Sequence, residues 1–378
     1  MNLSVSNVEE ELGTLRFRLA GVNVSIANAL RRIILSEIPT VIFKTEPFAE
    51  SKMTIEKNTT RLNNEIIKQR FSCIPIHIKD TTFPLDDHDV ELDVANTSGS
   101  IQFVTTRDLK IKNTTNDRYL ADDAVFKIFP PDPITKDWII IARLRPRTST
   151  AGGEALKLKS KLDIGIAKTN SAYNVVSTCS YRAAPDPVAM NAAWTEYNKM
   201  KSKENKTDWE EIRDTAKTDW LLLDGKRHVL QNVFDFVIES VGVFDNADIV
   251  YRGCDVMIHK LKTFMENIQA QPELIQESNV TIDNCVDVTL HGEDYTLGKV
   301  IEYVIYEKHF NLPSNASSDK TVAYCGFNKP HPHIDESIIR IGFNTSRDTT
   351  EITEILVAAA NHAIQIFEKI ATNFNERD

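Results

Sequence analysis

Apolar and polar residues alternate between residues 14 and 20, which is the period of a β-strand. Leu15, Phe17 and Leu19 fall on one face of this segment, as expected for a strand that covers a core on one side. Further along the chain, apolar residues recur three and four positions apart, which is the spacing of an amphipathic helix. The pattern therefore predicts a strand that leads directly into a helix.

Residues 23–40 carry the start and stop signals of this helix. Asn23 or Ser25 can cap its first turn, and Pro39 turns the preceding residue away from the helical conformation. The apolar face carries Ala27, Leu30 and Ile34, and the polar side carries Arg31 and Arg32. An ordinary surface helix with solvated arginines would show the same periodicity. The pattern alone therefore leaves the role of the two arginines open.

A succession of strand, short helix, strand and long helix is predicted twice. The first copy is predicted at residues 14–20, 23–40, 234–243 and 254–268, and the second at residues 286–290, 294–305, 337–343 and 351–372, where Asp294 can cap the short helix. Roughly 190 residues separate the short helix from the last strand in the first copy, against roughly 30 in the second. A duplicated half, with one copy interrupted by an insert, accounts for this difference.

The texture of the sequence changes near residue 79, where Pro, Asp and Thr accumulate and short β-like runs replace helical periodicity. We therefore expect an α+β fold in which two modules of short strands packed on helices pair within one chain. The predicted divisions are 1–78 and 227–268 for a discontinuous first module, 79–226 for an inserted β-rich domain with a polar extension, 269–279 for a linker, and 280–378 for a smaller second module. One helix is predicted in the polar extension, near residues 209–217.

Composition narrows the functional classes. A chain of 378 residues with 42% hydrophobic residues is long enough for two or three domains. Its net charge of −10 disfavours a surface that grips a phosphate backbone throughout. No apolar run approaches a membrane span, and the polar, acidic N-terminus lacks a secretory pattern. We therefore expect an intracellular protein without a membrane partner, which meets nucleic acid only indirectly.

The cysteines and motifs favour a protein without catalysis or a cofactor. Five scattered cysteines form neither a CxxC pair nor a disulfide framework, and they are interpreted as reduced, mostly buried thiols. The sequence contains no GxGxxG, GxxxxGK[ST], HExxH or GxSxG motif. The run of Arg143, Arg145 and Arg147 could approach nucleic acid or an acidic partner, although a solvated strand end has the same pattern. We predict neither catalytic residues nor a cofactor.

The two copies resemble the α-like assembly subunits of multisubunit DNA-directed RNA polymerases, the larger partner fused to the smaller. The larger partner is the third-largest polymerase II subunit or its archaeal D-like relative, and the smaller is the eleventh polymerase II subunit or its archaeal L-like relative. The resemblance rests on FRLAGVNVSIANALRRIILSEIPT (17–40), RLNNEIIKQRFSCIPI (61–76), FDFVIESVG (234–242) and VYRGCDVMIHKL (250–261) in the first copy, and on HGEDYTLGKVIEYVI (291–305), KPHPHIDESIIRIGF (329–343) and TNF (372–374) in the second.

This resemblance implies a non-catalytic assembly platform, in which two α-like dimerisation modules pair, dock on the second-largest subunit and then recruit the largest, together with small polymerase subunits. The implied dimerisation core is Phe17, Leu19, Ala27, Leu30, Ile34, Leu261, Leu297, Gly298, Ile301, Ile355 and Phe367. The implied docking residues for the large subunits are Arg31, Arg32, Glu65 and Arg70. Gly298 lies in a first helical turn, where glycine costs stability, so a close backbone approach is expected there. A stand-alone adaptor or enzyme that reuses the paired fold is the alternative.

The sequence departs from the family pattern in two respects. Many larger α-like subunits carry a cysteine zinc loop or a cluster site in the inserted domain, whereas Cys179 is the one cysteine between residues 79 and 180. A closed zinc site needs four ligands, so we predict no metal. Fusion of the two partners is similar to the polymerases of large DNA viruses. It implies a nuclear protein if the source is cellular, and a cytoplasmic viral factory or virion if a virus encodes the chain.

Overall fold

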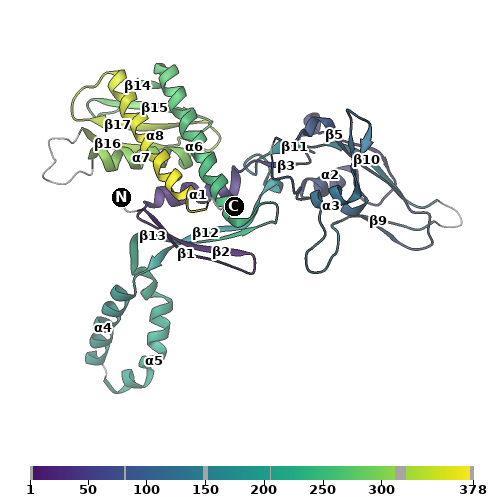
Figure 1. Ribbon diagram of the computed structural model, residues 1–378. Coiled ribbons are helices and arrows are strands. Elements are labelled where there is room, and N and C mark those ends of the chain that lie inside the picture. The colour runs from purple at the N-terminus through teal and green to yellow at the C-terminus, as the bar shows by residue number, and fades with distance from the viewer. Residues whose placement is uncertain (1–2, 81, 148–151, 205, 311–320, 375–378) are drawn as a thin grey trace. The chain divides into compact units, whose positions relative to one another are not determined.

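The computed structural model describes residues 3–80, 82–147, 152–204, 206–310 and 321–374 (Figure 1). Its helices and strands confirm the predicted α+β class. The chain divides into two compact units: unit 1 contains residues 1–33, 178–239 and 253–378, and unit 2 contains residues 34–177 and 240–252. Each unit is described separately below.

Two copies of one element order, ββαββα, make up most of unit 1, although residues 34–36, 176–177, 240 and 246–252 of the first copy are counted in unit 2. The first copy consists of β1 (Ser4–Glu11), β2 (Thr14–Ala20), α1 (Val24–Ser36), β12 (Val176–Pro185), β13 (Val229–Ser240) and α6 (Asn246–Ala270). The second copy consists of β14 (Ile275–Glu277), β15 (Cys285–His291), α7 (Tyr295–Ile305), β16 (Val322–Asn328), β17 (Glu336–Phe343) and α8 (Thr349–Ala371). The predicted repeat of strand, short helix, strand and long helix is therefore present. In addition, one further strand precedes each predicted strand: β1 before β2, β12 before β13, β14 before β15 and β16 before β17.

The two sheets have corresponding strand orders. The first is β1-β2-β13-β12 and the second is β14-β15-β17-β16. In each, the strand before the short helix pairs antiparallel with the strand before the long helix, as in the register Phe17↔Phe236 of the first sheet and Val288↔Ile339 of the second. These four side chains are at most 2% exposed. Each sheet therefore turns one face toward a core.

Side-chain caps begin the two short helices, as predicted. Asn23 Oδ1 accepts a hydrogen bond from the Ser25 amide at 2.9 Å, which resolves the choice between the two candidate caps of α1. Asp294 Oδ1 accepts from the Thr296 amide at 2.8 Å at the start of α7. Such caps satisfy amide groups that have no partner within the helix. The helix starts are thus determined by local sequence.

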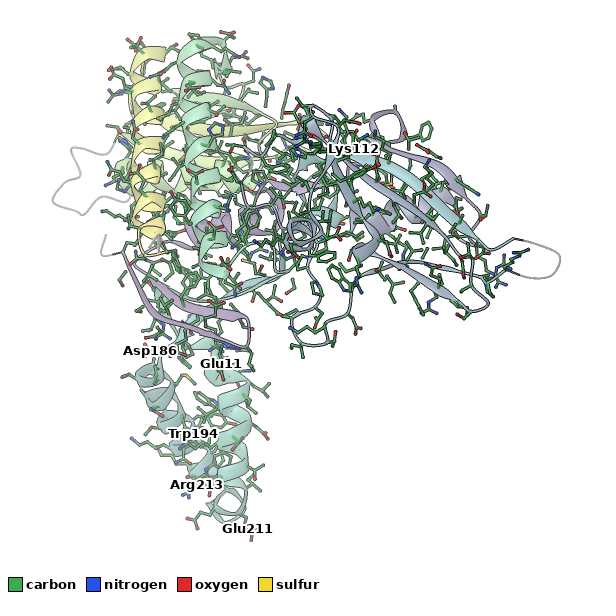
Figure 2. All side chains as sticks on the ribbon, turned by 45° about the vertical axis from the view of Figure 1, so that its right-hand side comes forward. Glu11, Lys112, Asp186, Trp194, Glu211 and Arg213 are labelled. Carbon is green, nitrogen blue, oxygen red and sulfur yellow. The ribbon has the colours of Figure 1, made fainter. Side chains whose placement is uncertain are left out.

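A helical hairpin joins β12 to β13 in unit 1. It consists of α4 (Pro187–Glu204) and α5 (Lys206–Leu222), where the sequence predicted one helix and a polar extension. Trp194, Trp209 and Trp220 are each about 7–8% exposed and pack together as a small core of their own. Figure 2 shows Trp194 between the two helices. The three tryptophans lie too far apart in the sequence to form an amphipathic stripe with helical spacing. Periodicity therefore does not predict this hairpin.

Unit 2 contains the β-rich part of the chain. Its strands are β3 (Thr40–Ile42), β4 (Met53–Asn58), β5 (His88–Ala95), β6 (Gln102–Thr105), β7 (Lys110–Asn113), β8 (Arg118–Tyr119), β9 (Ile140–Leu144), β10 (Ala155–Lys161) and β11 (Asp163–Gly165), and its helices are α2 (Asn64–Ser72) and α3 (Asp122–Ile128). They form a five-stranded sheet of order β4-β10-β5-β7-β8 and the two-stranded sheets β11-β3 and β6-β9.

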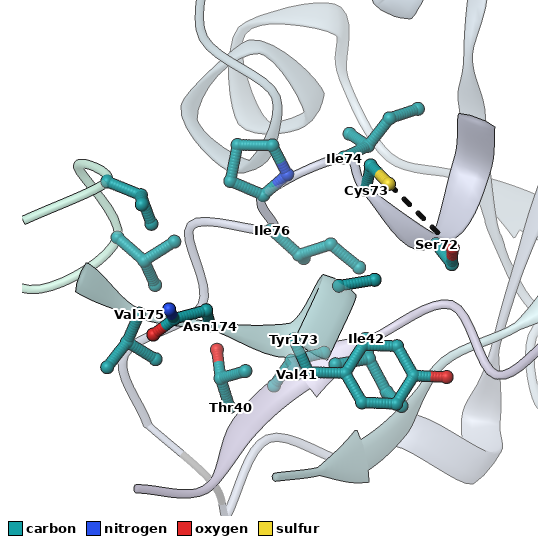
Figure 3. Close-up of a pocket in the computed structure, with 14 residues that line it drawn as sticks. Thr40, Val41, Ile42, Ser72, Cys73, Ile74, Ile76, Tyr173, Asn174 and Val175 are labelled. Atoms are coloured by element: carbon teal, nitrogen blue, oxygen red, sulfur yellow. Dashed lines mark hydrogen bonds between the residues drawn. The ribbon is translucent and has the colours of Figure 1, made fainter. Parts of the chain in front are cut away.

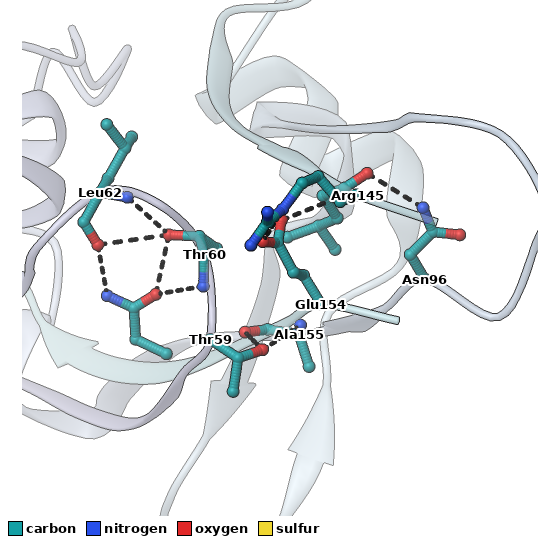
Figure 4. A network of polar contacts seen from close by, with 9 residues as sticks. Thr59, Thr60, Leu62, Asn96, Arg145, Glu154 and Ala155 are labelled. Atoms are coloured by element: carbon teal, nitrogen blue, oxygen red, sulfur yellow. Dashed lines mark hydrogen bonds and ion pairs between the residues drawn. The ribbon is translucent and has the colours of Figure 1, made fainter. Parts of the chain in front are cut away.

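A polar network ties together strand ends in unit 2 (Figure 4). The Arg145 amide donates to Glu154 Oε2 at 2.7 Å, and the Arg145 guanidinium also bonds this carboxylate. Burial of Glu154 works to raise its pKa, but the hydrogen bonds from Arg145 outweigh burial and lower the pKa. Arg143 lies over the Phe103 ring at 5.2 Å. Two of the three arginines of the basic run thus have structural partners in the unit itself.

The division into units differs from the predicted boundaries. Residues 34–78 were assigned to the first module but belong to unit 2. Strand β4 pairs with β10, and Ile67 and Phe71 of α2 share one apolar core with Val90 and Leu92 of β5. Residues 178–226 were assigned to the insert but belong to unit 1. Pairing between distant strands, which periodicity cannot reveal, decides both boundaries.

The predicted linker, residues 269–279, is also corrected. It contains β14, which pairs with β15 in the register Ile275↔Val288. Ile275 is 8% exposed, so this segment contributes to the core of the second copy. Three residues are too few to show a strand period, which explains why the sequence indicated only a polar connection.

Candidate functional site

Arg32 of α1 joins the first copy to the first turn of α7 in the second copy. Its Nε donates to Thr296 Oγ1 at 2.8 Å, and its Nη2 donates to Asp294 Oδ2 at 2.8 Å. The other oxygen of Asp294 caps α7. One carboxylate therefore starts a helix and also holds the arginine of the other copy. The side chains of Arg32 and Asp294 are 36% and 21% exposed, so salt screens this pair less than a fully exposed one.

Two further contacts join the copies. Lys260 Nζ of α6 lies 3.0 Å from Glu293 Oε2, immediately before α7. Phe17 of β2 stacks on Phe236 of β13, with centroids 5.0 Å apart, and meets Phe374 edge-on at 4.9 Å. Because Phe374 follows α8, the edge-on ring belongs to the second copy. Aromatic pairs of this geometry add about 0.5–1.5 kcal/mol beyond the area they bury.

Burial agrees with the position predicted for the dimerisation core, with one exception. The residues that are buried are Phe17, Leu19, Ala27, Leu30, Ile34, Leu261, Leu297, Gly298, Ile301 and Phe367. Ile355 is only half-buried, whereas its neighbour Leu356 is 0% exposed. Successive helical residues point about 100° apart, so Ile355 lies at the edge of the apolar stripe of α8. The contribution of these residues to pairing remains a prediction.

Gly298 meets a close neighbour, although not the one expected. A Cβ atom added at this position would lie 2.1 Å from two ring carbons of Phe327, in β16. The close neighbour is therefore an aromatic side chain and not a second backbone. Real Cβ atoms do not approach other atoms so closely, so substitution would force the ring or the helix to move.

The predicted docking residues lie in both units. Arg31, in unit 1, is half-buried, and its guanidinium donates twice to Asn28 Oδ1, at 3.1 and 2.9 Å. Glu65 and Arg70 are exposed on α2 in unit 2, where Arg70 Nη2 donates to the Ile140 carbonyl at 2.5 Å. No contact among the four is described, and docking on a large subunit remains a prediction for each. Arg32 has the additional partners described above.

Each sheet holds one arginine–aspartate pair across its two central strands. In the first copy Arg18 bonds Asp235 through both nitrogen–oxygen pairs, at 2.7 and 3.2 Å. In the second copy Arg340 bonds Asp287 in the same way, at 2.7 and 2.8 Å. The hydrogen bonds from Arg340 hold the pKa of Asp287 below its ordinary value. Two-point pairing of this kind orients the partners as well as attracting them.

The cysteines match the interpretation of free, mostly buried thiols. Cys179, Cys254 and Cys285 are buried, Cys325 is half-buried, and Cys73 is exposed. Burial raises the pKa of Cys179 and Cys325 to about 12, and it also raises the pKa of Cys254 and Cys285. Thiols with a raised pKa stay protonated at neutral pH and react slowly.

Within the described parts of the chain, no cluster of three or more His, Cys, Asp or Glu side chains is arranged to hold a metal ion. Nor does any helix in those parts combine the length and apolar character needed to cross a membrane. The absence of a metal stays a prediction for the whole protein, and elemental analysis tests it. The candidate functional site consists of the contacts between the two copies, which are made by Arg32, Lys260 and Phe17.

Several residues of this site were not predicted to join the copies. The sequence indicated Asp294 as a helix cap but could not indicate its bond to Arg32, which lies 262 positions away. Lys260 and Glu293 stood in the quoted segments 250–261 and 291–305 without an assigned contact, because a lone charged residue usually faces solvent. Phe374 stood in the TNF segment of the resemblance without an assigned contact. Distance along the chain conceals all of these partners.

Two family models match the chain. Both are described as the RNA polymerase Rpb3/Rpb11 dimerisation domain, and they match residues 16–261 and residues 285–373. The first match begins in β2 and ends in α6, and the second begins with β15 and ends just after α8. Each match thus covers one copy from its second strand to its long helix, and the first match also spans the insertions that this copy carries.

Individual proteins give a consistent likeness. Subunit RPAC1 of DNA-directed RNA polymerases I and III from Homo sapiens is 26% identical over 310 residues, covering 71% of this chain and 85% of the human protein. Subunit Rpo3 of the polymerase of Pyrococcus furiosus is 25% identical over 291 residues, covering 71% and 97%. Subunit 3B of polymerases IV and V from Arabidopsis thaliana is 34% identical over 186 residues, covering 45% of this chain and 54% of the plant protein.

Proposed function

Because the chain belongs to the RNA polymerase Rpb3/Rpb11 dimerisation family, we propose that it provides, in one polypeptide, the paired platform on which the large polymerase subunits assemble. It is a fused α-like subunit of DNA-directed RNA polymerase. Its role is in assembly and not in catalysis, since the activity of such a polymerase belongs to the whole complex. Its partners are therefore other polymerase subunits.

One observation carries the proposal: most of both copies of the ββαββα frame lies in the same compact unit, and within that unit Arg32 bonds the helix cap of the opposite copy. The connection between α6 and β14 is only four residues long, from 271 to 274. A short tether keeps the second copy at an effective concentration of order millimolar near the first. The fusion therefore favours pairing within one chain over exchange between chains.

We propose that the second-largest subunit docks first and the largest follows, with Arg31, Arg32, Glu65 and Arg70 as docking residues. The exposed charges of Glu65 and Arg70 support this role because they are accessible on α2. Arg32 has a part in joining the copies, so its substitution would disturb pairing as well as docking. Arg31 and Arg70 are therefore the more informative positions for a docking test.

Coexpression with the second-largest subunit tests the docking step. Arg31→Glu and Arg70→Glu should each reduce its copurification at least tenfold, because charge reversal places like charges against the partner. Arg118→Glu, an exposed arginine of β8 without an assigned role, serves as the matched control. All three variants should melt within about 1–2 °C of the parent, as expected for surface changes. Unchanged copurification of both docking variants would remove these residues from the proposed interface.

A native pull-down from the source, cells or virions, tests the function itself. Two very large polypeptides of the polymerase should copurify with the chain. A preparation that contains neither would reject the polymerase role. We place the protein where its polymerase works, in the nucleus of a cellular source or in the viral factory or virion of a large DNA virus, and the pull-down identifies which.

A further inference from the structure

Unit 2 contains a cavity of about 220 Å³ (Figure 3). Its walls are formed by β3, the segment 72–76 after α2, the segment 172–175, and Val241 with Val243. Most of the lining side chains are buried, whereas Cys73 and Val241 are exposed at its rim. The cavity therefore reaches the surface. For comparison, an apolar cavity of about 150 Å³ accommodates benzene, so this one has room for an aromatic ring with a substituent.

Thr40 places one unsatisfied polar atom in this apolar setting. Its side chain is 6% exposed, and its Oγ1 has no hydrogen-bond partner among the described residues. Its backbone takes part in the β3–β11 ladder opposite Gly165. Figure 3 shows the hydroxyl directed toward the side chains that enclose the cavity. A buried hydroxyl without a partner costs free energy, which an occupant that bonds it would recover.

Two other polar side chains of the lining already have partners. Ser72 Oγ donates to the Gln69 carbonyl at 2.7 Å. Asn174 Oδ1 accepts from the Val176 amide at 3.2 Å. None of the described residues that line the cavity is Asp, Glu, Lys, Arg or His. A charged occupant would therefore lose its hydration without gaining a counter-charge. The complementary group is apolar over most of its surface and carries a single hydroxyl.

We propose that this cavity receives a tyrosine side chain from a partner polymerase subunit, with the tyrosine hydroxyl bonded to Thr40 Oγ1. A tyrosine matches both properties of the lining, since it has an apolar ring and one polar tip. Aromatic residues seated in such pockets are the usual anchors of protein interfaces. The inference rests on the proposed assembly function and adds to it a specific anchoring point.

Blocking the cavity provides the main test. Ala172 is half-buried in the lining, so Ala172→Trp should fill the entrance with little effect on the fold. Its matched control is Ser171→Trp, because Ser171 is exposed and does not belong to the lining. Affinity for the copurifying polymerase subunits should fall at least tenfold for Ala172→Trp and stay within twofold for Ser171→Trp. Equal affinity of the two variants, both melting as the parent does, would overturn the inference.

The hydroxyl is tested by Thr40→Val, which keeps the side-chain shape and removes the polar atom. The affinity of the variant for the polymerase subunits should fall about fivefold, which is equivalent to the loss of about 1 kcal/mol for one hydrogen bond. Two small probes examine the same bond in the isolated protein. Binding of p-cresol should exceed that of toluene by about fivefold in the parent, and the preference should vanish in Thr40→Val. A preference that persists in the variant would contradict the assigned bond.

Cys73 offers a readout in the assembled complex. It is the exposed thiol, whereas the other four are buried or half-buried and the pKa of each is raised, so they react slowly. Labelling of Cys73 by N-ethylmaleimide should slow at least tenfold once the partner subunits are bound. Equal labelling of the free and assembled protein would overturn the inference.

The outcomes separate the two proposals. If the parent protein copurifies with no polymerase subunit, then the proposed function fails. If the parent copurifies and Ala172→Trp does so equally well, then only the tyrosine anchor fails. If p-cresol binds at micromolar concentration and does not compete with the subunits, then the cavity is a small-molecule site and the partner assignment is wrong.

Discussion

The two ββαββα copies place different residues at corresponding positions. Counted from the helix caps Asn23 and Asp294, Leu30 of α1 corresponds to Ile301 of α7, since each follows its cap by seven residues. Both are 0% exposed. On the central strands the first copy has arginine on β2 and aspartate on β13, whereas the second has aspartate on β15 and arginine on β17. The frame therefore requires a buried apolar residue on the short helix and an ion pair on the central strands. It does not determine which apolar residue is buried, or which of the two strands carries the arginine.

The copies differ more in what they carry between their elements. Between α1 and β12 the first copy carries most of unit 2, whereas the second carries residues 306–321 between α7 and β16. Between its last two strands the first copy carries the α4–α5 hairpin, and the second carries only residues 329–335. The entropy of closing a loop grows slowly with length. Insertions that possess their own cores, as both of these do, can therefore be accommodated without altering the frame.

The largest effect is expected from a charge at the corresponding buried positions. Leu30→Asp and Ile301→Asp should each destabilise unit 1 by more than about 4 kcal/mol, because each buries a charge without a partner. Val24→Asp and Tyr295→Asp are matched controls, since both positions follow their caps directly and are 48% exposed. Val24→Asp should change stability by less than about 0.5 kcal/mol. Tyr295→Asp also loses the edge contact of its ring with Phe327 and should cost no more than about 1.5 kcal/mol. Urea unfolding measures all four. Parent-like stability of Leu30→Asp would place that residue at the surface.

A smaller effect is expected where the copies differ in a small residue. Gly298 and Ala27 each follow their caps by four residues. Gly298→Ala should cost about 1–3 kcal/mol, because the added methyl group collides with the Phe327 ring. Ala27→Gly should cost about 1 kcal/mol from lost helix propensity.

Pairing Gly298→Ala with Phe327→Leu should recover part of this loss, because the smaller side chain leaves space for the methyl group. A double-mutant cycle by urea unfolding gives the coupling energy directly. Strict additivity of the two substitutions would show that the ring does not impose the glycine.

The cap residues provide a third comparison. Asp294→Asn should keep the cap of α7 but lose the ion pair with Arg32, and it should cost about 1 kcal/mol. Asn23→Asp makes the reverse exchange at the cap of α1, since it replaces an amide by a carboxylate. It should change stability by less than about 0.5 kcal/mol. Arg32→Glu should be worse than Asp294→Asn, because it places two carboxylates together. Equal melting temperatures of Arg32→Glu and the parent would show that the contact between Arg32 and Asp294 does not contribute to stability.

The smallest effect concerns pH. The pKa of Asp287 is lowered in the folded state by Arg340, so the pair stabilises the fold above the pKa of an unfolded aspartate, near 3.9. This stabilisation is lost as the pH falls through the lower, folded value. Asp287→Asn should therefore cost less than about 1 kcal/mol at pH 7 and progressively less as the pH falls below the ordinary aspartate range. A constant difference between the variant and the parent from pH 7 to pH 2 would exclude this linkage.

Part of the candidate site could be predicted from neighbouring residues. The caps Asn23 and Asp294 and the buried face of α1 depend on side chains at most four positions apart, so periodicity indicates them. The family resemblance indicated the paired halves. Ile355 shows the limit of this reasoning, because a helical stripe has edges and only packing decides how far each edge is covered.

By itself, the sequence determined the strand, short helix, strand and long helix of each copy, their duplication and the start of each short helix, because these depend on local spacing and capping. The tertiary structure decided the rest. It joined residues 34–78 to the β-rich unit through the pairing of β4 with β10, added β14 to the second sheet, and folded the polar extension around three tryptophans. It also brought Arg32 to Asp294 and left the Thr40 hydroxyl in a cavity without a partner among the residues that the structure describes. Such contacts join residues far apart in the chain, and no local pattern encodes their distance in space.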